Sequence, residues 1–173
     1  STSLSSPHTP LAIAQNVEAG DGGQIRPEIV AGADALYILY STTTALVVAR
    51  MASTVGPWTT TTVSPPGAKG PFLATITPKA GGGVVVAGLV HNGTASEVFV
   101  DGKVVFTGGA DGVCMCCKPS LFARKEGLIL AFRDADGKRR DIRTLTSPDG
   151  VTWTDAGEAT HGAWSPGGCP ADG

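Results

Sequence analysis

The chain has 173 residues, of which 42% are hydrophobic and 16% are charged, and its formal net charge at pH 7 is −2. This length and apolar content suffice for one well-buried domain, whereas so small a charge argues against a nucleic-acid partner. The longest apolar runs, such as GGGVVVAGLV, are too short to span a bilayer. The composition therefore predicts a globular chain with no membrane span.

A short phrase with a central proline recurs along the chain, as IRPEIVA, KGPFLAT, CKPSLFA and GCPADG. After each of the first three prolines we expect a short apolar strand, a turn and a stronger second strand, at 35–41, 83–90 and 127–133. Third strands are expected at 45–51, 95–100 and 139–145, and weaker fourth strands at WTTTTV, KVVFTG and TWTDAGE. Runs of this length, rich in β-branched and aromatic residues and without a 3.6-residue period, predict an all-β structure.

Three sets of four strands are typical of the blades of a β-propeller. We therefore predict an all-β propeller of four-stranded antiparallel blades over residues 1–173. Its expected parts are a closing strand at 11–17, a first blade at 24–64, a second at 70–109, a third at 117–160 and the start of a fourth at 167–173.

Three complete blades do not close a ring, and an open propeller leaves sheet faces unburied. We expect this chain to be half of a six-bladed ring. The missing blades would come from a second polypeptide, most simply the C-terminal half of the same precursor, cut after Gly173. A homodimer of two such halves is the alternative.

The stretch SPDGVTWTDAG closes the third set of strands with Ser147, Asp149, Gly150, Thr152 and Trp153. It resembles the Asp-box of sialidases and related BNR-repeat propellers, with one residue fewer than the usual S-x-D-x-G-x-T-W. An aspartate at a turn accepts backbone N–H bonds, the glycine permits a tight bend, and the tryptophan packs between sheets. The motif predicts architecture and carries no chemistry.

The cysteines fall where two predicted blades begin. Cys114, Cys116 and Cys117 precede the first strand of the third blade, and Cys169 precedes that of the fourth. The first strand of a propeller blade lines the central channel, so residues just before it lie at the channel mouth. All four sulfurs should meet there, and Arg26, at the matching position of the first blade, should point to the same place.

Over roughly residues 111–173, the combination of CMCCKPSL, RRDIRTLTSPDGVTW, THGAW and CPADG resembles a group of bacterial exported BNR-repeat proteins with CxCC and CPxDG motifs. The resemblance implies a periplasmic or extracellular location and a sialidase-like fold, and it says more about fold than about function. Sialidases also carry an arginine triad, a Tyr–Glu nucleophile pair and an acidic proton donor. Arg26 in IRPEI is similar to the arginine of their Arg-Ile-Pro motif.

The cysteines have two possible roles. Thiolates select Cu(I), Zn(II) or iron–sulfur clusters, and the C-x-C-C spacing lets a short loop place several sulfurs around one ion. The spacing differs from the C-x₂-C pairs of common zinc modules, and metal binding protects thiolates in an oxidising compartment, so we favour copper, held by Cys114, Cys116, Cys117 and Cys169. The alternative is disulfides, with a bridge from the cluster to Cys169 easier than one between the adjacent Cys116 and Cys117. Met115 could add a thioether or pack in the core.

A redox-active copper that is reachable through the channel predicts an oxidoreductase acting on a small molecule, with catalytic roles for His161 and Arg26. His161 is also a possible nitrogen ligand. The contrasting predictions are a glycan-binding propeller with purely structural cysteines and a glycoside hydrolase that spans both polypeptides. Carboxylates available to the hydrolase are those of Glu28, Asp111 and Asp172.

Overall fold

The computed structural model describes residues 27–52, 56–70, 72–93, 95–109, 112–135, 139–162 and 165. These residues form three four-stranded antiparallel sheets, each with its strands in chain order. The first sheet holds β1 (Glu28–Ala31), β2 (Leu36–Ser41), β3 (Leu46–Met51) and β4 (Thr59–Thr62). The middle sheet holds β5 (Ala74–Pro78), β6 (Val84–His91), β7 (Ser96–Val100) and β8 (Lys103–Thr107). The third sheet holds β9 (Ser120–Arg124), β10 (Gly127–Arg133), β11 (Ile142–Ser147) and β12 (Thr154–Glu158).

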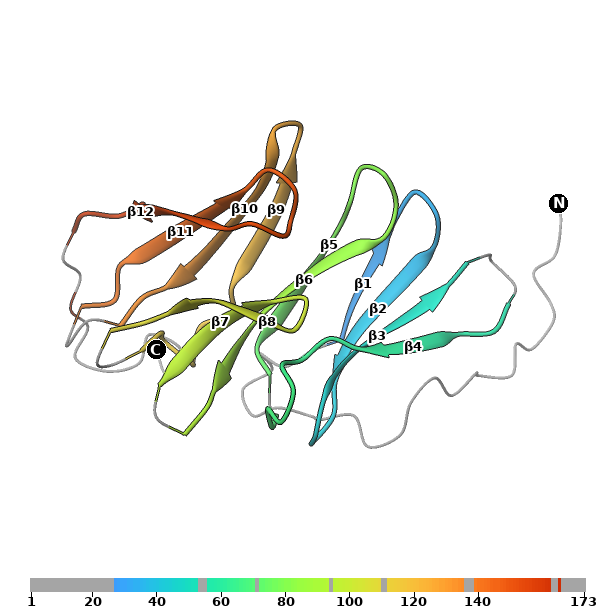
Figure 1. The fold of residues 1–173 in the computed structure, drawn as a ribbon, viewed down its shortest axis with the longest axis horizontal. Helices are drawn as coiled ribbons and strands as arrows, with labels where there is room; N and C mark the ends of the chain where they lie inside the picture. Colours follow the sequence, from blue (N-terminus) through green and yellow to red (C-terminus); the bar gives the residue numbers. More distant parts are fainter. Residues whose placement is uncertain are drawn as a thin grey trace, which may run out of the picture.

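The three sheets lie side by side (Figure 1). Along most strands, buried side chains alternate with less buried ones. In β10, buried Leu128, Leu130 and Phe132 alternate with less buried residues, as expected for a strand that packs on one face. In β6, by contrast, Val85 to Val90 are all buried because sheets cover both faces of this strand. An unbroken apolar run in the sequence thus indicates a strand of the middle sheet, which is covered on both faces.

Two hydrophobic clusters fill the spaces between the sheets. The cluster between the first and middle sheets includes Tyr37, Leu39, Leu46, Phe72, Val86 and Phe99. The cluster between the middle and third sheets includes Val85, Leu89, Val98, Leu130, Phe132 and Leu145. Burial of these side chains is the main contribution to holding the sheets together.

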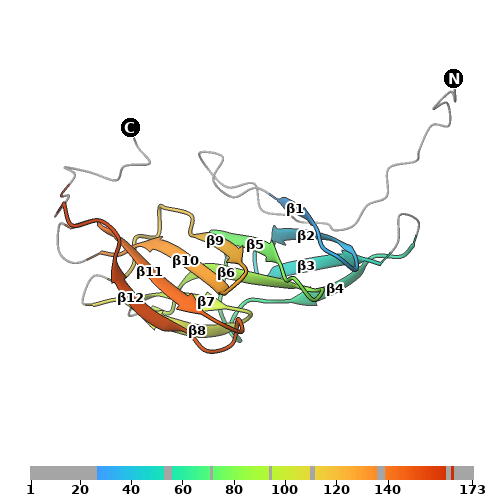
Figure 2. The ribbon, with the colours of Figure 1, turned by 90° about the horizontal axis from the view of Figure 1, so that it is seen from above.

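The first strands of the sheets, β1, β5 and β9, run along one side of the molecule, and β4, β8 and β12 along the other (Figure 2). One carboxylate joins the starts of these three first strands. Glu28 accepts hydrogen bonds from the backbone N–H of Ile76 at 3.1 Å and from Thr75 Oγ1 at 3.3 Å, and it forms an ion pair with Lys118, just before β9. The first half of β5 and the segment that precedes β9 are thereby held beside Glu28.

The turn at Ser147–Thr152 makes the hydrogen bonds that its sequence predicts. Asp149 Oδ1 accepts hydrogen bonds from the backbone N–H groups of Val151 and Thr152, both at 2.8 Å, and Ser147 Oγ accepts one from Gly150 at 2.8 Å. Gly150 has a φ of 77°, a conformation that favours glycine. Trp153 packs against the cluster between the middle and third sheets. The motif is therefore a folding element of the third sheet.

The structure confirms the all-β prediction and the three sets of four strands, while one boundary was wrong. The strand expected at 139–145 spans Ile142–Ser147 instead, because its continuous pairing with β10 runs from Arg133–Ile142 to Leu128–Ser147. The strand expected at 11–17 and the fourth-blade start expected at 167–173 lie outside the described residues. The part of the chain that the structure describes contains no helix long and apolar enough to cross a membrane.

Candidate metal-binding site

The cysteine loop, residues 114–119, is an excursion from the edge of the third sheet. On one side of it, Ser120 pairs with Ala131 of β10, and on the other side Val113 pairs with Asp134. Ala131 and Asp134 are three residues apart in the sequence, whereas their partners are seven residues apart. The segment that contains the cysteines therefore has four more residues than the strand it pairs with. The chain leaves the ladder after residue 114, turns, and returns to it at β9. The Cys117 N–H closes this turn on the Cys114 carbonyl at 3.4 Å.

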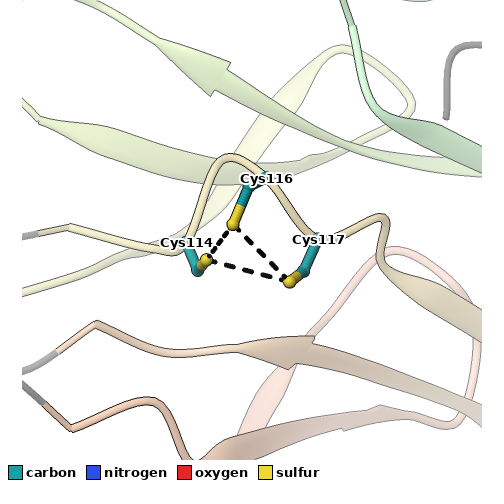
Figure 3. A group of neighbouring side chains, drawn as sticks. All are labelled: Cys114, Cys116 and Cys117. Atoms are coloured by element: carbon teal, nitrogen blue, oxygen red, sulfur yellow. Dashed lines mark hydrogen bonds between the residues drawn. The ribbon is translucent and has the colours of Figure 1, made fainter. Parts of the chain in front are cut away.

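Three sulfur atoms converge inside this loop, and they point toward one another (Figure 3). The Sγ atoms of Cys114 and Cys117 are 3.8 Å apart, those of Cys116 and Cys117 are 3.7 Å apart, and those of Cys114 and Cys116 are 2.8 Å apart. Three sulfurs placed about 2.3 Å from one ion would be about 4 Å apart. Two of the distances are close to this value, and the third would have to open by about 1 Å. The group could hold a metal ion.

The three cysteines differ in burial and in redox state. Cys114 is buried, while Cys116 and Cys117 are half-buried. Cys114 and Cys117 are free thiols, whereas Cys116 is disulfide-bonded. The oxidised chain therefore offers two thiols in this loop, and a three-thiolate site requires reduction of the bond at Cys116. The fourth cysteine, Cys169, lies outside the described residues, so the bridge expected between it and the cluster stays a prediction.

The surroundings of the loop disfavour a free thiolate. The pKa of Cys117 lies above its ordinary value, first because burial desolvates the charged form, and second because Cys114 is close by; the positive charge of Arg133 acts in the opposite direction. A metal ion that binds here must displace the thiol proton, so metal binding releases protons into solution.

Two other residues of the loop hold it against the scaffold. Met115 packs against the cluster between the middle and third sheets, which is the packing role considered for it from the sequence. Lys118 pairs with Glu28 on β1, and burial lowers the pKa of this lysine. Glu28 also accepts hydrogen bonds from Thr75 and Ile76, so its carboxylate has a structural role in this chain.

The structure does not bring His161 into the cysteine group. His161 is exposed and follows β12, which is the fourth strand of the third sheet, whereas the cysteine loop leads into β9 at the opposite edge of that sheet. Arg26 lies outside the described residues, as do Cys169, Asp111 and Asp172. The catalytic roles of His161 and Arg26 stay predictions.

The sequence alone did not single out Lys118 or Arg133 as neighbours of the cysteines. Arg133 ends the strand GLILAFR, and only the shift in pairing across the loop places it opposite Cys114. Lys118 stands next to Cys117 in the sequence, yet its partner, Glu28, is on a different sheet. A lysine directly after the cysteines was the one available signal.

The cysteine group is thus identified by the geometry of this chain. The resemblance to exported BNR-repeat proteins, drawn from the CxCC and Asp-box motifs, stays a prediction. The chain matches no protein-family model, and no curated protein or solved structure is significantly similar to it.

Proposed function

We propose that this chain binds one thiophilic metal ion, Cu(I), through Cys114, Cys116 and Cys117. The observation that carries the proposal is the convergence of three sulfur atoms, all within 4.8 Å of one another, on one short loop. Cys114 and Cys117 are free thiols although their Sγ atoms are only 3.8 Å apart, and two thiolates this close repel one another. A shared cation removes that repulsion.

The number and type of ligands favour Cu(I) over other soft ions. Thiolate sulfur selects Cu(I), zinc and iron–sulfur clusters. Structural zinc is almost always bound by four ligands in a tetrahedron, whereas the group among the described residues supplies three. A three-coordinate ion of low charge suits this set best.

The first test measures binding by the reduced protein. With all thiols reduced under anaerobic conditions, the chain should take up one Cu(I) in competition with a chromophoric chelator and should gain a sulfur-to-copper absorption in the near ultraviolet. Loss of an outer partner of a metal ligand costs about 10–100-fold in affinity, so replacing a ligand itself by serine should cost at least about 100-fold. Cys114→Ser and Cys117→Ser are the two informative variants.

Two controls separate the metal site from the rest of the loop. Met115→Leu should bind Cu(I) as the wild type does, since Met115 packs in the core. Cys169→Ser tests the predicted bridge, and it should bind Cu(I) without prior reduction if Cys169 is the partner of Cys116. A fully reduced wild type that takes up no Cu(I) would contradict the proposed function.

We also propose that the three sheets are blades of a larger ring, completed by a second polypeptide, and that the cysteine loop lies at the mouth of its channel. The contacts of Glu28 with Thr75 and Ile76 of β5 and with Lys118, just before β9, support this, because ring closure requires the first strands to face a common axis. Oxidation of a small molecule by the bound copper would need a second oxidation state at the site. Voltammetry of the copper-loaded protein tests whether one is accessible.

A further inference from the structure

The disulfide bond at Cys116 lies beside a free thiol. Cys116 is disulfide-bonded, whereas Cys114 is a free, buried cysteine whose Sγ atom is 2.8 Å from that of Cys116. Disulfides exchange when a thiolate attacks one of the two bonded sulfurs. Reacting atoms about 3–3.5 Å apart already form a near-attack arrangement. The sulfur of Cys114 is therefore within attacking distance of a bonded sulfur in the folded chain.

The backbone holds the attacking residue in place. The Cys114 N–H donates a hydrogen bond to the Arg133 carbonyl at 2.9 Å, and the Cys114 carbonyl accepts one from the Cys117 N–H at 3.4 Å. Both backbone polar groups of Cys114 are thus bonded, one to the sheet and one across the loop. Two reacting groups that the fold already holds together avoid much of the entropy cost of meeting.

The second free thiol of the loop is placed less well for this reaction. The Sγ atom of Cys117 is 3.7 Å from that of Cys116, and the two residues are adjacent in the sequence. Consecutive Cα atoms are about 3.8 Å apart, whereas those of disulfide-bonded cysteines are usually about 4.4–6.8 Å apart, so a bridge between neighbours is strained. Cys114 is therefore the thiol expected to attack.

We propose that the cysteine loop is a site of thiol–disulfide exchange in which Cys114 attacks Cys116. A bond forms between the Sγ atoms of Cys114 and Cys116, and the bond between Cys116 and its present partner, predicted to be Cys169, breaks. The electron pair of the broken bond leaves with the partner sulfur. Cys114 loses one proton and the released thiolate takes one up, so the exchange consumes no oxidant and no reductant.

The exchange changes what the loop offers to a metal ion. Before it, the loop holds two thiols, those of Cys114 and Cys117, and after it only the thiol of Cys117 is left. A potential ligand is thus withdrawn while the number of disulfides in the chain stays the same. The exchange itself needs no metal, so it does not depend on the metal-binding function proposed above.

The test follows the bridge in the metal-free, unreduced protein. N-ethylmaleimide is added, samples are quenched in acid over time, and the cysteines are mapped by mass spectrometry. Because maleimide reacts irreversibly with the released sulfur, it collects the exchanged form even when that form is the minor one at equilibrium. The wild type should accumulate an internal Cys114–Cys116 bridge, with label on Cys117 and on the former partner. The rate should stay constant over about a tenfold range of protein concentration, because the attack is intramolecular.

Two variants complete the test. Cys114→Ser removes the attacking sulfur and should keep the original bridge, with no label on the partner of Cys116. Met115→Leu keeps an apolar side chain between the two cysteines and should exchange as the wild type does, since Met115 packs in the core. Circular dichroism and a thermal melt of each variant confirm that it folds.

Three results would overturn the proposal. The first is label on Cys114 and Cys117 of the wild type with the original bridge intact, and the second is an internal bridge between Cys116 and Cys117. The third is a rate that rises with protein concentration, which would show exchange between molecules. These readouts come from the wild type and stand even if Cys114→Ser fails to fold. Copper binding is measured on the reduced protein, so either proposal can fail without the other.

Discussion

Asp34 lies in the turn between β1 and β2 and accepts hydrogen bonds from two sheets. The Tyr37 hydroxyl donates to its two oxygens at 2.9 and 2.8 Å, the Arg50 Nη2 to Oδ2 at 3.1 Å, and the backbone N–H of Gly83, just before β6, to Oδ1 at 2.9 Å. These bonds, that from Gly83 first, lower the pKa of Asp34 to about 2. The ionised carboxylate joins the first and middle sheets at the end remote from the cysteine loop.

The depressed pKa predicts a window of acid sensitivity. An aspartate in the unfolded chain titrates near a pKa of about 3.9, so the stabilisation from Asp34 is complete above about pH 4 and is lost as the pH falls toward about 2. Asp34→Asn should be less stable than the wild type above about pH 4, and the difference should shrink toward pH 2. Urea unfolding midpoints at several pH values measure it.

A matched control for Asp34→Asn is Glu126→Gln. Glu126 is 67% exposed and its ion pair with Arg124 is 3.8 Å long, so its removal should hardly change the pH dependence. If the difference in stability between Asp34→Asn and wild type stayed constant across this pH range, these contacts would not lower the pKa of Asp34.

At the scale of single elements, β6 depends on a glycine opposite an aromatic ring. Gly88 pairs directly with Phe99 of β7, and a Cβ atom at Gly88 would lie 2.5 and 2.7 Å from two atoms of that ring. Phe99 is fully buried and packs edge-to-face on Phe72, with ring centroids 6.2 Å apart. The ring occupies the space that the side chain of residue 88 would otherwise take.

Substitution of this glycine should be costly even with the smallest side chain. Gly88→Ala would force the Phe99 ring to shift within the core between the first and middle sheets, and overpacking of this kind costs about 1–3 kcal/mol. Chemical denaturation measures the loss. Gly81→Ala is the control, because a Cβ at Gly81 meets nothing within 4 Å. Equal stability of the two variants would contradict the packing argument.

The sequence predicted the strands well and the contacts between sheets poorly. Alternation in GLILAFR and the unbroken run VVVAGLV located β10 and β6 because local pattern reflects burial. The cysteine group was also predictable, since its three members share one loop. The position of Arg133 was not, because it depends on a shift of four residues in strand pairing that no local pattern encodes.

At the scale of the whole molecule, each end sheet exposes a large apolar side chain on the face turned away from the middle sheet. Ile29 on β1 is 63% exposed, while its neighbour Val30 packs toward the middle sheet. Phe122 on β9 is 65% exposed, while Leu121 packs inward. A single exposed apolar side chain is ordinary on a protein surface, but both of these lie on the faces that neighbouring blades would cover in the proposed ring.

The chain alone should therefore self-associate through its end sheets when the second polypeptide is missing. Sedimentation velocity should show species larger than a monomer, and Phe122→Asp should shift the distribution toward the monomer. Val151→Asp is the control, since Val151 is 68% exposed but lies in the turn before β12, off the end face. A stable, monodisperse wild-type monomer would contradict the proposed ring.

The cysteine loop interrupts a strand without disturbing the pairing on either side of it. Because Ser120 pairs with Ala131 of β10 and Val113 pairs with Asp134, the residue directly after β10, residues 115–118 could be excised to leave one continuous edge strand. The cysteine loop could therefore be removed without loss of the sheet that carries it. A lineage could gain or lose the thiol cluster by a single short insertion or deletion, and the same four residues could be grafted onto the edge of an unrelated antiparallel sheet.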